Sequence, residues 1–406
     1  MQLPEELNII SIRIKLIDSP DKTGLIYGKV KMEGEPLSGG RRNIIILAGF
    51  LLIMVVIFYL LIDGITPLQF DKDVPSFSAE PLQIDNVLYF DRNCIICGRG
   101  ERLEGYRPDN FEPLWGIKPG FPVKKIWNTD GGFILDTSKG IEMFDPAAKK
   151  TLWRFSAGEG PQRLLDVCGG FSLMEGRIKG EEEFNLFFID DKGELKWNFP
   201  LNSETLINGC IASDGEYIAV STLKVQNSIN GKIIMFNSKG ELLWAKVYDG
   251  VLINFLNFNK DGELTALKEN TLVRFSPEGQ LKREQTLGGQ ILRASASREG
   301  YLVLCRRESP ESNILKGGRN VLELYNPSGR RQWQVELDHE CRDIKITDDG
   351  RIIIALLDNS VLALTARGEF IGEYRTDFSI NSIVTPPEGI PFIINHAEGS
   401  ALINNY

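Results

Sequence analysis

Two cysteines and two histidines are the residues whose types and spacing could support redox or metal chemistry. Cys94 and Cys97 have the CxxC spacing of thiol redox centres and zinc sites. There is no second CxxC, and the only histidines are His339 and His396, so a four-ligand zinc shell is hard to assemble. On a β-strand this spacing also places the two thiols on opposite faces. We therefore interpret the pair as structural.

The full cysteine complement is even but sparse for a chain of 406 residues. The six positions are Cys94, Cys97, Cys168, Cys210, Cys305 and Cys341. An even number permits three disulfides outside the cell, and fifteen pairings are formally open. We interpret these residues mainly as small buried apolar side chains.

The other short motifs are typical of turns. Asn259–Gly262 and Asp348–Gly350 resemble calcium loops but lack the alternating acidic ligands and the distal glutamate. The glycines form no GxGxxG or Walker sequence, and neither histidine lies in an HExxH or triad context. The sequence predicts no metal, no cofactor and no catalytic residue.

A set of basic and amide residues recurs about six to eight positions before a turn. Its members are Lys124, Arg163, Asn208, Asn254, Arg293, Arg342 and Asn381. If these residues begin the innermost strands of a ring, they gather around one mouth of its central channel. Such a mouth suits an anionic or glycan-like ligand, or an acidic loop of a partner protein. The alternative is that polar residues occur wherever a strand meets solvent.

The elements that must position this set are short strands in a repeat marked by tryptophan. In three hairpins an Asp or Asn precedes the tryptophan by seven residues, with a turn glycine between them; these are Asp190–Trp197, Asn237–Trp244 and Asn326–Trp333. Looser copies end at Trp115 and Trp153. Ser276–Arg283 and Thr365–Gly372 keep the turn without the tryptophan.

Successive hairpins end 38 to 50 residues apart, close to the period of a propeller blade. A second turn in each interval gives four strands per period. The sequence therefore predicts an all-β propeller of eight four-stranded blades, with seven blades as the alternative. We expect Trp115, Trp153, Trp197, Trp244 and Trp333 to fill gaps between neighbouring blades, a structural role.

The last blade is short of one strand at the C-terminus. After Gly372 the chain offers Ile380–Val384, Pro391–Asn395 and Ala401–Tyr406. An open strand edge invites aggregation, so a strand from the N-terminal side should complete the blade. Phe77–Ile84 is placed to do so.

The Asp/Asn-x-x-Gly-x-Leu-x-Trp hairpins resemble the PQQ-type (quinoprotein-like) propeller repeat and, more distantly, the WD-type repeat, over about residues 80–406. The resemblance includes dehydrogenases that use pyrroloquinoline quinone and calcium with a vicinal cysteine pair. It also includes membrane-tethered, non-catalytic propellers that scaffold protein complexes. This chain has no adjacent cysteines, and it looks like an uncharacterised bacterial family of the second kind.

A single membrane span is predicted before the repeats. Ile44–Ile62 contains nineteen residues without a charge, which as a helix is roughly 28 Å long. Arg41 and Arg42 precede the span, which places the N-terminus in the cytoplasm and the repeats outside. The position of the span and the lack of a small-x-small site favour an uncleaved signal anchor over a cleaved signal peptide.

The span divides the chain into four predicted parts. Residues 1–43 form a cytoplasmic segment, either a small β-hairpin or a disordered tail; residues 44–62 are the span, 63–79 a tether and 80–406 the extracytoplasmic propeller. The chain has 46 basic and 55 acidic residues, and seven and six of these precede residue 44. The outer part is therefore acidic, and a nucleic-acid partner is not expected.

These features predict a non-catalytic protein- or ligand-binding scaffold at the cell surface, with a protein or cell-envelope partner. The alternative is a quinoprotein-like or other enzyme that uses the propeller channel. A metal or chromophore bound to the purified outer domain would distinguish the alternative.

Overall fold

The computed structural model describes residues 76–404 except 83–85, 100, 159, 226–227, 309–317 and 387–390. The described residues all belong to one compact unit, Ile65–Tyr406. The predicted span Ile44–Ile62, the segment before it and all but the last residues of the tether lie outside the described residues. In the described part, no helix has the length and apolar character needed to cross a bilayer.

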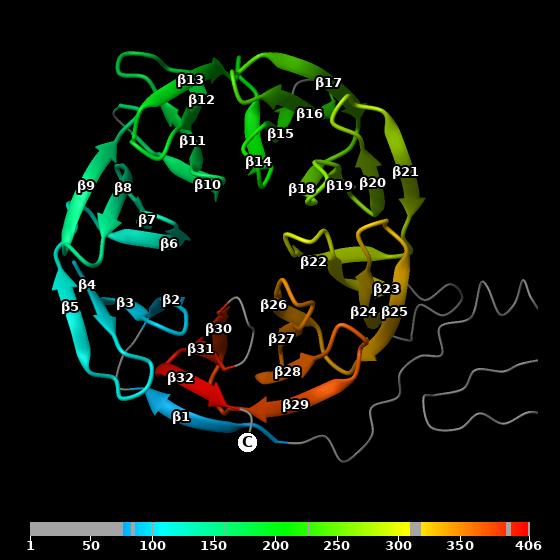
Figure 1. Ribbon diagram of the computed structural model, residues 1–406. Helices are drawn as coiled ribbons and strands as arrows, with labels where there is room; N and C mark the ends of the chain where they lie inside the picture. Colours follow the sequence, from blue (N-terminus) through cyan, green and yellow to red (C-terminus); the bar gives the residue numbers. More distant parts are fainter. Residues whose placement is uncertain are drawn as a thin grey trace, which may run out of the picture. The chain divides into compact units, whose positions relative to one another are not determined.

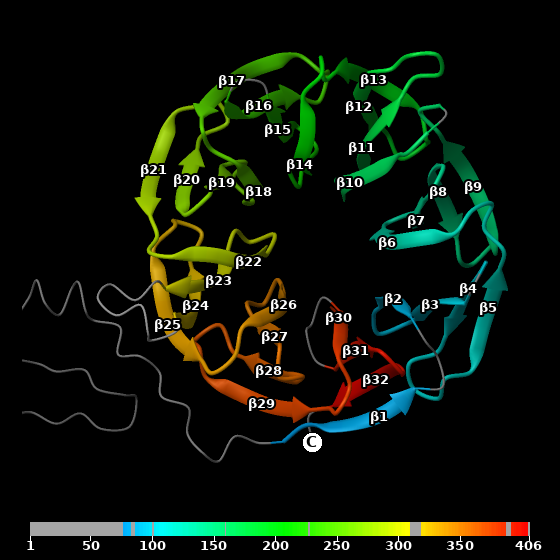
Figure 2. The same cartoon turned by 180° about the vertical axis from the view of Figure 1, so that it is seen from behind.

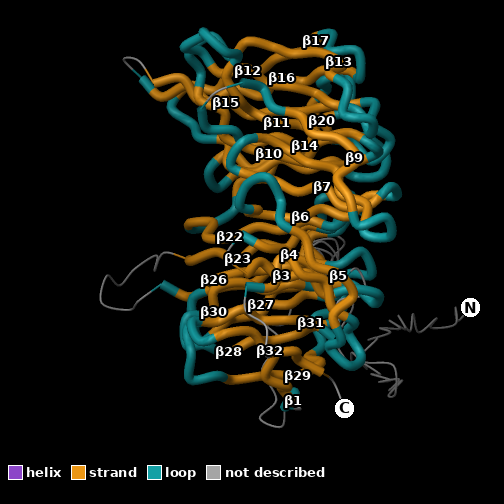
Figure 3. The backbone as a smooth tube through the Cα atoms, turned by 90° about the vertical axis from the view of Figure 1, so that its left-hand side faces the viewer, coloured by secondary structure: helices purple, strands orange, loops and turns teal. Residues whose placement is uncertain are grey.

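The described residues form a ring of eight antiparallel sheets, each with four strands (Figure 1). The prediction of an eight-bladed all-β propeller is confirmed, and the seven-bladed alternative is wrong. Seen edge-on, this part of the chain consists of strands and loops (Figure 3).

The blades are numbered along the chain, and each is given from its innermost to its outermost strand. Blade 1 contains β2 (Val87–Phe90), β3 (Ile95–Arg99), β4 (Arg102–Tyr106) and β5 (Pro113–Ile117); blade 2 contains β6 (Val123–Thr129), β7 (Gly132–Thr137), β8 (Gly140–Asp145) and β9 (Lys150–Phe155). Blade 3 contains β10 (Arg163–Cys168), β11 (Phe171–Arg177), β12 (Phe184–Ile189) and β13 (Leu195–Pro200); blade 4 contains β14 (Thr205–Ile211), β15 (Tyr217–Val225), β16 (Ile229–Asn237) and β17 (Leu242–Asp249). Blade 5 contains β18 (Ile253–Phe258), β19 (Leu264–Lys268), β20 (Thr271–Phe275) and β21 (Leu281–Thr286); blade 6 contains β22 (Gln290–Ala296), β23 (Leu302–Glu308), β24 (Arg319–Tyr325) and β25 (Arg331–Leu337). Blade 7 contains β26 (Cys341–Ile346), β27 (Ile352–Leu356), β28 (Ser360–Leu364) and β29 (Phe370–Arg375); blade 8 contains β30 (Ile380–Val384), β31 (Phe392–His396), β32 (Gly399–Asn404) and β1 (Ser78–Leu82).

The ring is closed by β1, the first described strand, which is the outermost strand of blade 8 (Figure 1). All five residues of β1 pair with β32, from Ser78 opposite Asn404 to Leu82 opposite Ser400. The prediction that a strand within Phe77–Ile84 completes the last blade is confirmed. The strand edge that the C-terminal hairpin leaves open is thereby paired.

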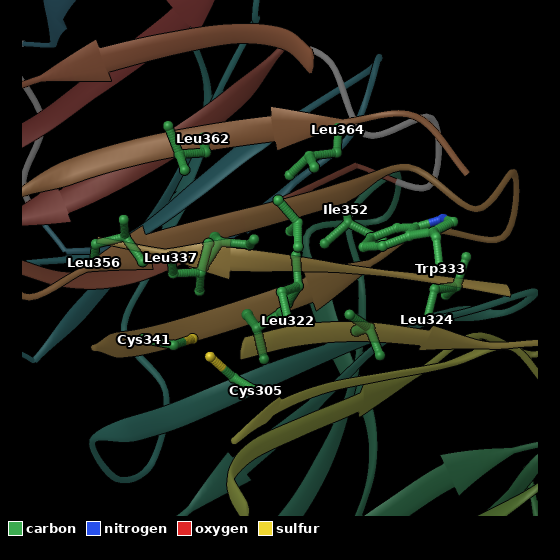
Figure 4. Close-up of a cluster of buried hydrophobic side chains, with 14 residues drawn as sticks. Cys305, Leu322, Leu324, Trp333, Leu337, Cys341, Ile352, Leu356, Leu362 and Leu364 are labelled. Atoms are coloured by element: carbon green, nitrogen blue, oxygen red, sulfur yellow. The ribbon is translucent and has the colours of Figure 1, made fainter. Parts of the chain in front are cut away.

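The position of a strand within its blade decides its sequence pattern. Middle strands are covered by neighbouring blades on both faces, so they read as continuous apolar runs, as in β27 and β28, whose residues are all buried. Outermost strands have one face in solvent and alternate, as in β13. Blades 6 and 7 pack through one such apolar cluster, which includes Leu322, Trp333 and Ile352 (Figure 4).

The repeated tryptophans lie on the outermost strands β5, β9, β13, β17 and β25. Four of their indole N–H groups donate to a backbone carbonyl in the next blade: Trp153 to Asp191 (2.7 Å), Trp197 to Ser238 (3.1 Å), Trp244 to Pro277 (2.8 Å) and Trp333 to Ala366 (2.9 Å). Trp115 instead packs over Gly105 of its own blade and against Phe144 of the next. These contacts join blades 1, 2, 3, 4 and 6 each to the next blade.

The turn glycine of the repeat is fitted to the tryptophan of the preceding blade. At Gly240 the backbone has a φ of 81°, and a Cβ atom there would lie 2.6 Å from the ring of Trp197. Only glycine satisfies both the backbone angle and the close approach. The spacing of Gly and Trp in the sequence therefore reflects packing between blades.

Candidate functional site

All seven residues of the predicted site lie on innermost strands, which converge on the axis of the ring (Figure 2). They come from seven different blades: Lys124 from β6, Arg163 from β10, Asn208 from β14, Asn254 from β18, Arg293 from β22, Arg342 from β26 and Asn381 from β30. Each is among the first four residues of its strand. We call the face of the ring at which the innermost strands begin the leading face.

A β-bulge divides this set into three registers. Every innermost strand skips one residue in its pairing with the second strand, and the skipped residues are Leu88, Lys124, Leu165, Ile207, Asn254, Leu292, Arg342 and Asn381. Asn208 and Arg293 follow the bulge directly, whereas Arg163 precedes it by two positions. The set therefore does not form one ring of equivalent side chains.

Four cations of the set reach the next blade. Lys124 Nζ donates to the Gln162 carbonyl (3.4 Å), Arg163 to the Leu206 carbonyl (2.7 Å) and Arg293 Nε to the Arg342 carbonyl (2.9 Å), and Arg342 donates to the Ser379 hydroxyl. These bonds hold the side chains in place across blade boundaries. A guanidinium has five N–H donors, so the arginines keep donors for a ligand.

Two aspartates on the innermost strands are occupied by backbone amides. Asp166 accepts from Val167 N (2.9 Å) and from Ile211 N of blade 4 (2.8 Å). Asp343 accepts in the same way from Ile344 N (2.9 Å) and from Ile383 N of blade 8 (3.0 Å). Both aspartates directly follow the bulge, so the same residue type at the same strand position makes the same inter-blade hydrogen bond in two blades.

The charge of Arg163 is largely neutralised. Its guanidinium lies 3.1 Å from the Glu175 carboxylate. Both line a cavity of about 690 Å³ between blades 3 and 4 that also contains Glu182, Glu183 and Glu204. The surroundings of Arg163 are therefore acidic and do not favour an anion.

Two further cations, Lys125 and Lys345, lie on the innermost strands of blades 2 and 7. Desolvation lowers the pKa of Lys125 on β6, and the nearby Lys345 of β26 lowers it further, while Asp166 and Asp136 raise it. Lys125 lies 4.0 Å from the centre of the Trp127 ring, and Lys345 lies 3.4 Å from Asp343. Two ammonium groups from separate blades are thus close enough to influence each other, and each also has a carboxylate beside it: Asp136 is directly opposite Lys125 in the ladder between β6 and β7, and Asp343 pairs with Lys345.

Sequence reasoning named Lys124 as the site residue of β6 and missed Lys345, Asp136 and Arg298. Burial raises the pKa of Asp136 to about 6, against the lowering effects of Lys124 and Lys125. Arg298 follows β22 and lines a cavity of about 440 Å³ whose other walls are in blades 2, 3 and 4. Lys345 and Arg298 come from distant blades, so no local spacing could have indicated them, whereas Asp136 lies on β7 directly opposite Lys125.

The remaining chemical candidates occupy separate places. Cys94 and Cys97 pack in different apolar clusters, as expected from their spacing on a strand. His396 stacks on Phe378 at 5.1 Å, and His339 Nε2 lies 3.5 Å from Asp358. Across the described ranges no group of three or more His, Cys, Asp or Glu side chains is arranged to hold a metal ion.

Solved structures that resemble this chain are propellers of varied origin. The C-terminal WD40 domain of Sif2 has a TM-score of 0.62 at 12% identity and covers 81% of this chain and 98% of its own. BamB from Moraxella catarrhalis has a TM-score of 0.53 at 14% identity, with 82% and 100% covered. Sqt1 from Saccharomyces cerevisiae has a TM-score of 0.57 at 11% identity, with 83% and 100% covered. At these identities the likeness shows the fold alone.

No curated protein matches the sequence. One family model does, described as a family of unknown function (DUF5711), over residues 178–397. This match covers more than half of the chain, from within blade 3 to just after β31, the second strand of blade 8. The chain therefore belongs to the DUF5711 family of unknown function.

Proposed function

We propose that this chain is a non-catalytic binding scaffold, anchored in the cell membrane by Ile44–Ile62, whose extracytoplasmic propeller binds an acidic segment of a partner protein. The observation that carries the proposal is the group of cations near the axis on blades 2, 6 and 7. Its members are Lys124, Lys125, Arg293, Arg342 and Lys345. This group is defined as the cation cluster.

Three features of the cation cluster support anion binding. Lys124, Arg293 and Arg342 are held in place by bonds to the next blade, so less side-chain freedom is lost when a ligand binds. Desolvation, and then the charge of Lys345, lower the pKa of Lys125, and a bound anion would reduce the effect of that like charge. The chain as a whole has a net charge of −9, so an acidic partner segment would be attracted to the cation cluster and repelled by most of the remaining surface.

The proposed membrane location rests on the sequence. A nineteen-residue apolar run preceded by Arg41 and Arg42 supports a span with the propeller outside. The PQQ-like repeat resemblance supports the scaffold role, since that superfamily includes membrane-tethered, non-catalytic propellers that scaffold protein complexes.

The binding part is tested with the triple variant Lys124→Gln, Arg293→Gln, Arg342→Gln. We expect about tenfold weaker binding of a fluorescent deca-glutamate peptide, since three partly exposed charges each contribute about 0.5 kcal/mol. The measurement is fluorescence anisotropy with the full chain in detergent micelles, at two salt concentrations. The variant should also show a weaker dependence on salt.

Two controls separate the cluster from general charge. The triple Lys118→Gln, Arg319→Gln, Arg375→Gln removes the same charges from exposed side chains that are not on innermost strands. Arg163→Gln removes a cation of the predicted set that Glu175 neutralises. Both should bind within twofold of the parent. Equal losses in all three variants, or no loss in the cluster variant, would show that the cation cluster is not the site.

The membrane address is tested with Val55→Asp, Val56→Asp. Each carboxylate at the centre of a span costs about 2.5–3.5 kcal/mol on insertion scales, so we expect the chain to leave the membrane fraction. Carbonate extraction followed by immunoblotting measures the distribution, and Val55→Ala, Val56→Ala is the control. Retention of the double aspartate variant in the membrane would contradict the predicted span.

A further inference from the structure

Two cysteines from neighbouring blades face each other in the core of the propeller. Cys305 lies on β23 of blade 6 and Cys341 at the start of β26 of blade 7. Their side chains are 0% and 1% exposed and belong to the same apolar cluster. The sulfur atoms point toward one another across the blade boundary (Figure 4).

The thiol pair lies beside the hydrogen bond that Arg293 and Arg342 form between the same two blades. Cys305 is directly opposite Arg293 in the ladder between β22 and β23. Cys341 immediately precedes Arg342, whose carbonyl accepts from Arg293 Nε at 2.9 Å. This hydrogen bond links β22 of blade 6, the strand that pairs with β23, to β26 of blade 7 beside the two thiols.

The other cysteines do not share this arrangement. Cys94 and Cys97 pack in separate clusters, and so do Cys168 and Cys210. Within the described residues, which include all six cysteines, the pair Cys305 and Cys341 is the one whose members lie in a single cluster. A Cys305–Cys341 bond is compatible with three of the fifteen complete pairings that the sequence left open.

We propose that Cys305 and Cys341 form a disulfide between blades 6 and 7 when the chain folds in an oxidising compartment. The oxidant is a disulfide, such as oxidised glutathione or the disulfide of a thiol oxidoreductase. One cysteine thiolate attacks it, forming a mixed disulfide and releasing one thiol. The second cysteine then attacks the mixed disulfide, forming the Cys305–Cys341 bond and releasing the other thiol. The two cysteines lose two protons and two electrons, and the oxidant gains them.

The bond forms before the blades close over the thiols. In the finished fold both sulfurs are shielded from solvent, so an oxidant has no access to them. The hydrogen bond with Cys305, together with burial, also raises the pKa of Cys341, which leaves little of the reactive thiolate. If the chain folds with both thiols reduced, they therefore stay reduced. The presence of the disulfide thus depends on the redox conditions of the compartment in which the chain folds.

Refolding of the full chain in detergent micelles tests the proposal without reference to any ligand. The protein is unfolded in guanidinium with a reductant, refolded with or without a glutathione redox couple, and alkylated to trap free thiols. Trypsin then releases residues 299–306 and 332–342, which carry Cys305 and Cys341. We expect these peptides to be joined, with two hydrogen atoms fewer, after refolding in the redox couple.

Melting temperature provides the second readout. A crosslink between blades constrains the unfolded chain, so the oxidised protein should melt about 3 °C or more above the reduced protein. Cys305→Ala and Cys341→Ala should each abolish the difference, whereas Cys168→Ala should keep it. Alkylation of both thiols in protein that refolded in the redox couple, or a bond from Cys341 to another cysteine, would overturn the proposal.

Discussion

Replacing Glu323 with alanine is expected to lower the free energy of unfolding by about 3–5 kcal/mol. Glu323 lies on β24 and is fully buried. Its carboxylate accepts from Arg306 (2.9 Å), Arg331 (2.7 Å) and the Tyr325 hydroxyl (2.8 Å). Arg306 is only 4% exposed, so the substitution leaves a buried guanidinium without its main counter-charge.

The charge on Glu323 makes part of this stability depend on pH. Burial tends to raise the pKa of Glu323, but the hydrogen bonds and charges of Arg306 and Arg331 outweigh it, and the pKa lies below its ordinary value of 4.5. A lowered pKa in the folded state contributes stability that is present above pH 4.5 and is lost as the pH falls through the folded value. The difference in stability between the parent and Glu323→Gln should therefore shrink below about pH 4.5.

Guanidinium denaturation followed by tryptophan fluorescence measures both effects between pH 7 and pH 3. Glu284→Ala removes a half-exposed carboxylate paired with Lys268 and should cost less than about 1 kcal/mol. Glu323→Leu combined with Arg306→Met removes both buried charges and should recover most of the loss. A loss below about 1.5 kcal/mol in Glu323→Ala would show that the network contributes little.

Blade number and ring closure could be predicted from the sequence because their signals are local. Turn glycines such as Gly193 and Gly240 recur at a fixed distance before a tryptophan, and each hairpin carries its own turn chemistry. The need for one more strand in the last blade follows from counting the strand-like segments after Gly372 against four per blade. Ser78–Leu82 then takes the one free edge that the count leaves.

The candidate site could be predicted only in outline. Counting back from the turn places its residues on innermost strands, but the count crosses a β-bulge that a sequence does not mark. It therefore treated Arg163, Arg293 and Arg342 as equivalent. Their difference comes from Glu175, which reaches Arg163 from the adjacent strand and forms an ion pair with it.

Contacts across the ring have no sequence signal. Lys125 and Lys345 lie on blades 2 and 7, and the repulsion between them depends on the closure of the ring. Cys305 and Cys341 occupy different strands in successive blades, so the repeat does not align them. In this chain the repeat period determines the scaffold, whereas the side chains that depart from it determine the site.

Deleting residues 76–82 is expected to have the largest effect on the fold. Leu82 packs with Val87 and Ile393, and the Phe77 ring lies 5.9 Å from Phe392 and covers Gly372 of blade 7. Phe77 N also donates to the Glu373 carbonyl at 2.8 Å. The segment thus touches blades 1, 7 and 8, and its removal opens the ring and exposes the edge of β32.

An exposed edge of this kind pairs with other chains, so the deletion should convert a monodisperse chain into aggregates and abolish its cooperative melting. Light scattering after size-exclusion chromatography and thermal unfolding measure the change, and deletion of residues 69–75 is the control of equal length. Phe77→Ala should give a folded intermediate case that is less stable by about 3–5 kcal/mol. An unchanged melting temperature after deletion of residues 76–82 would mean that seven blades and a three-stranded eighth close without β1.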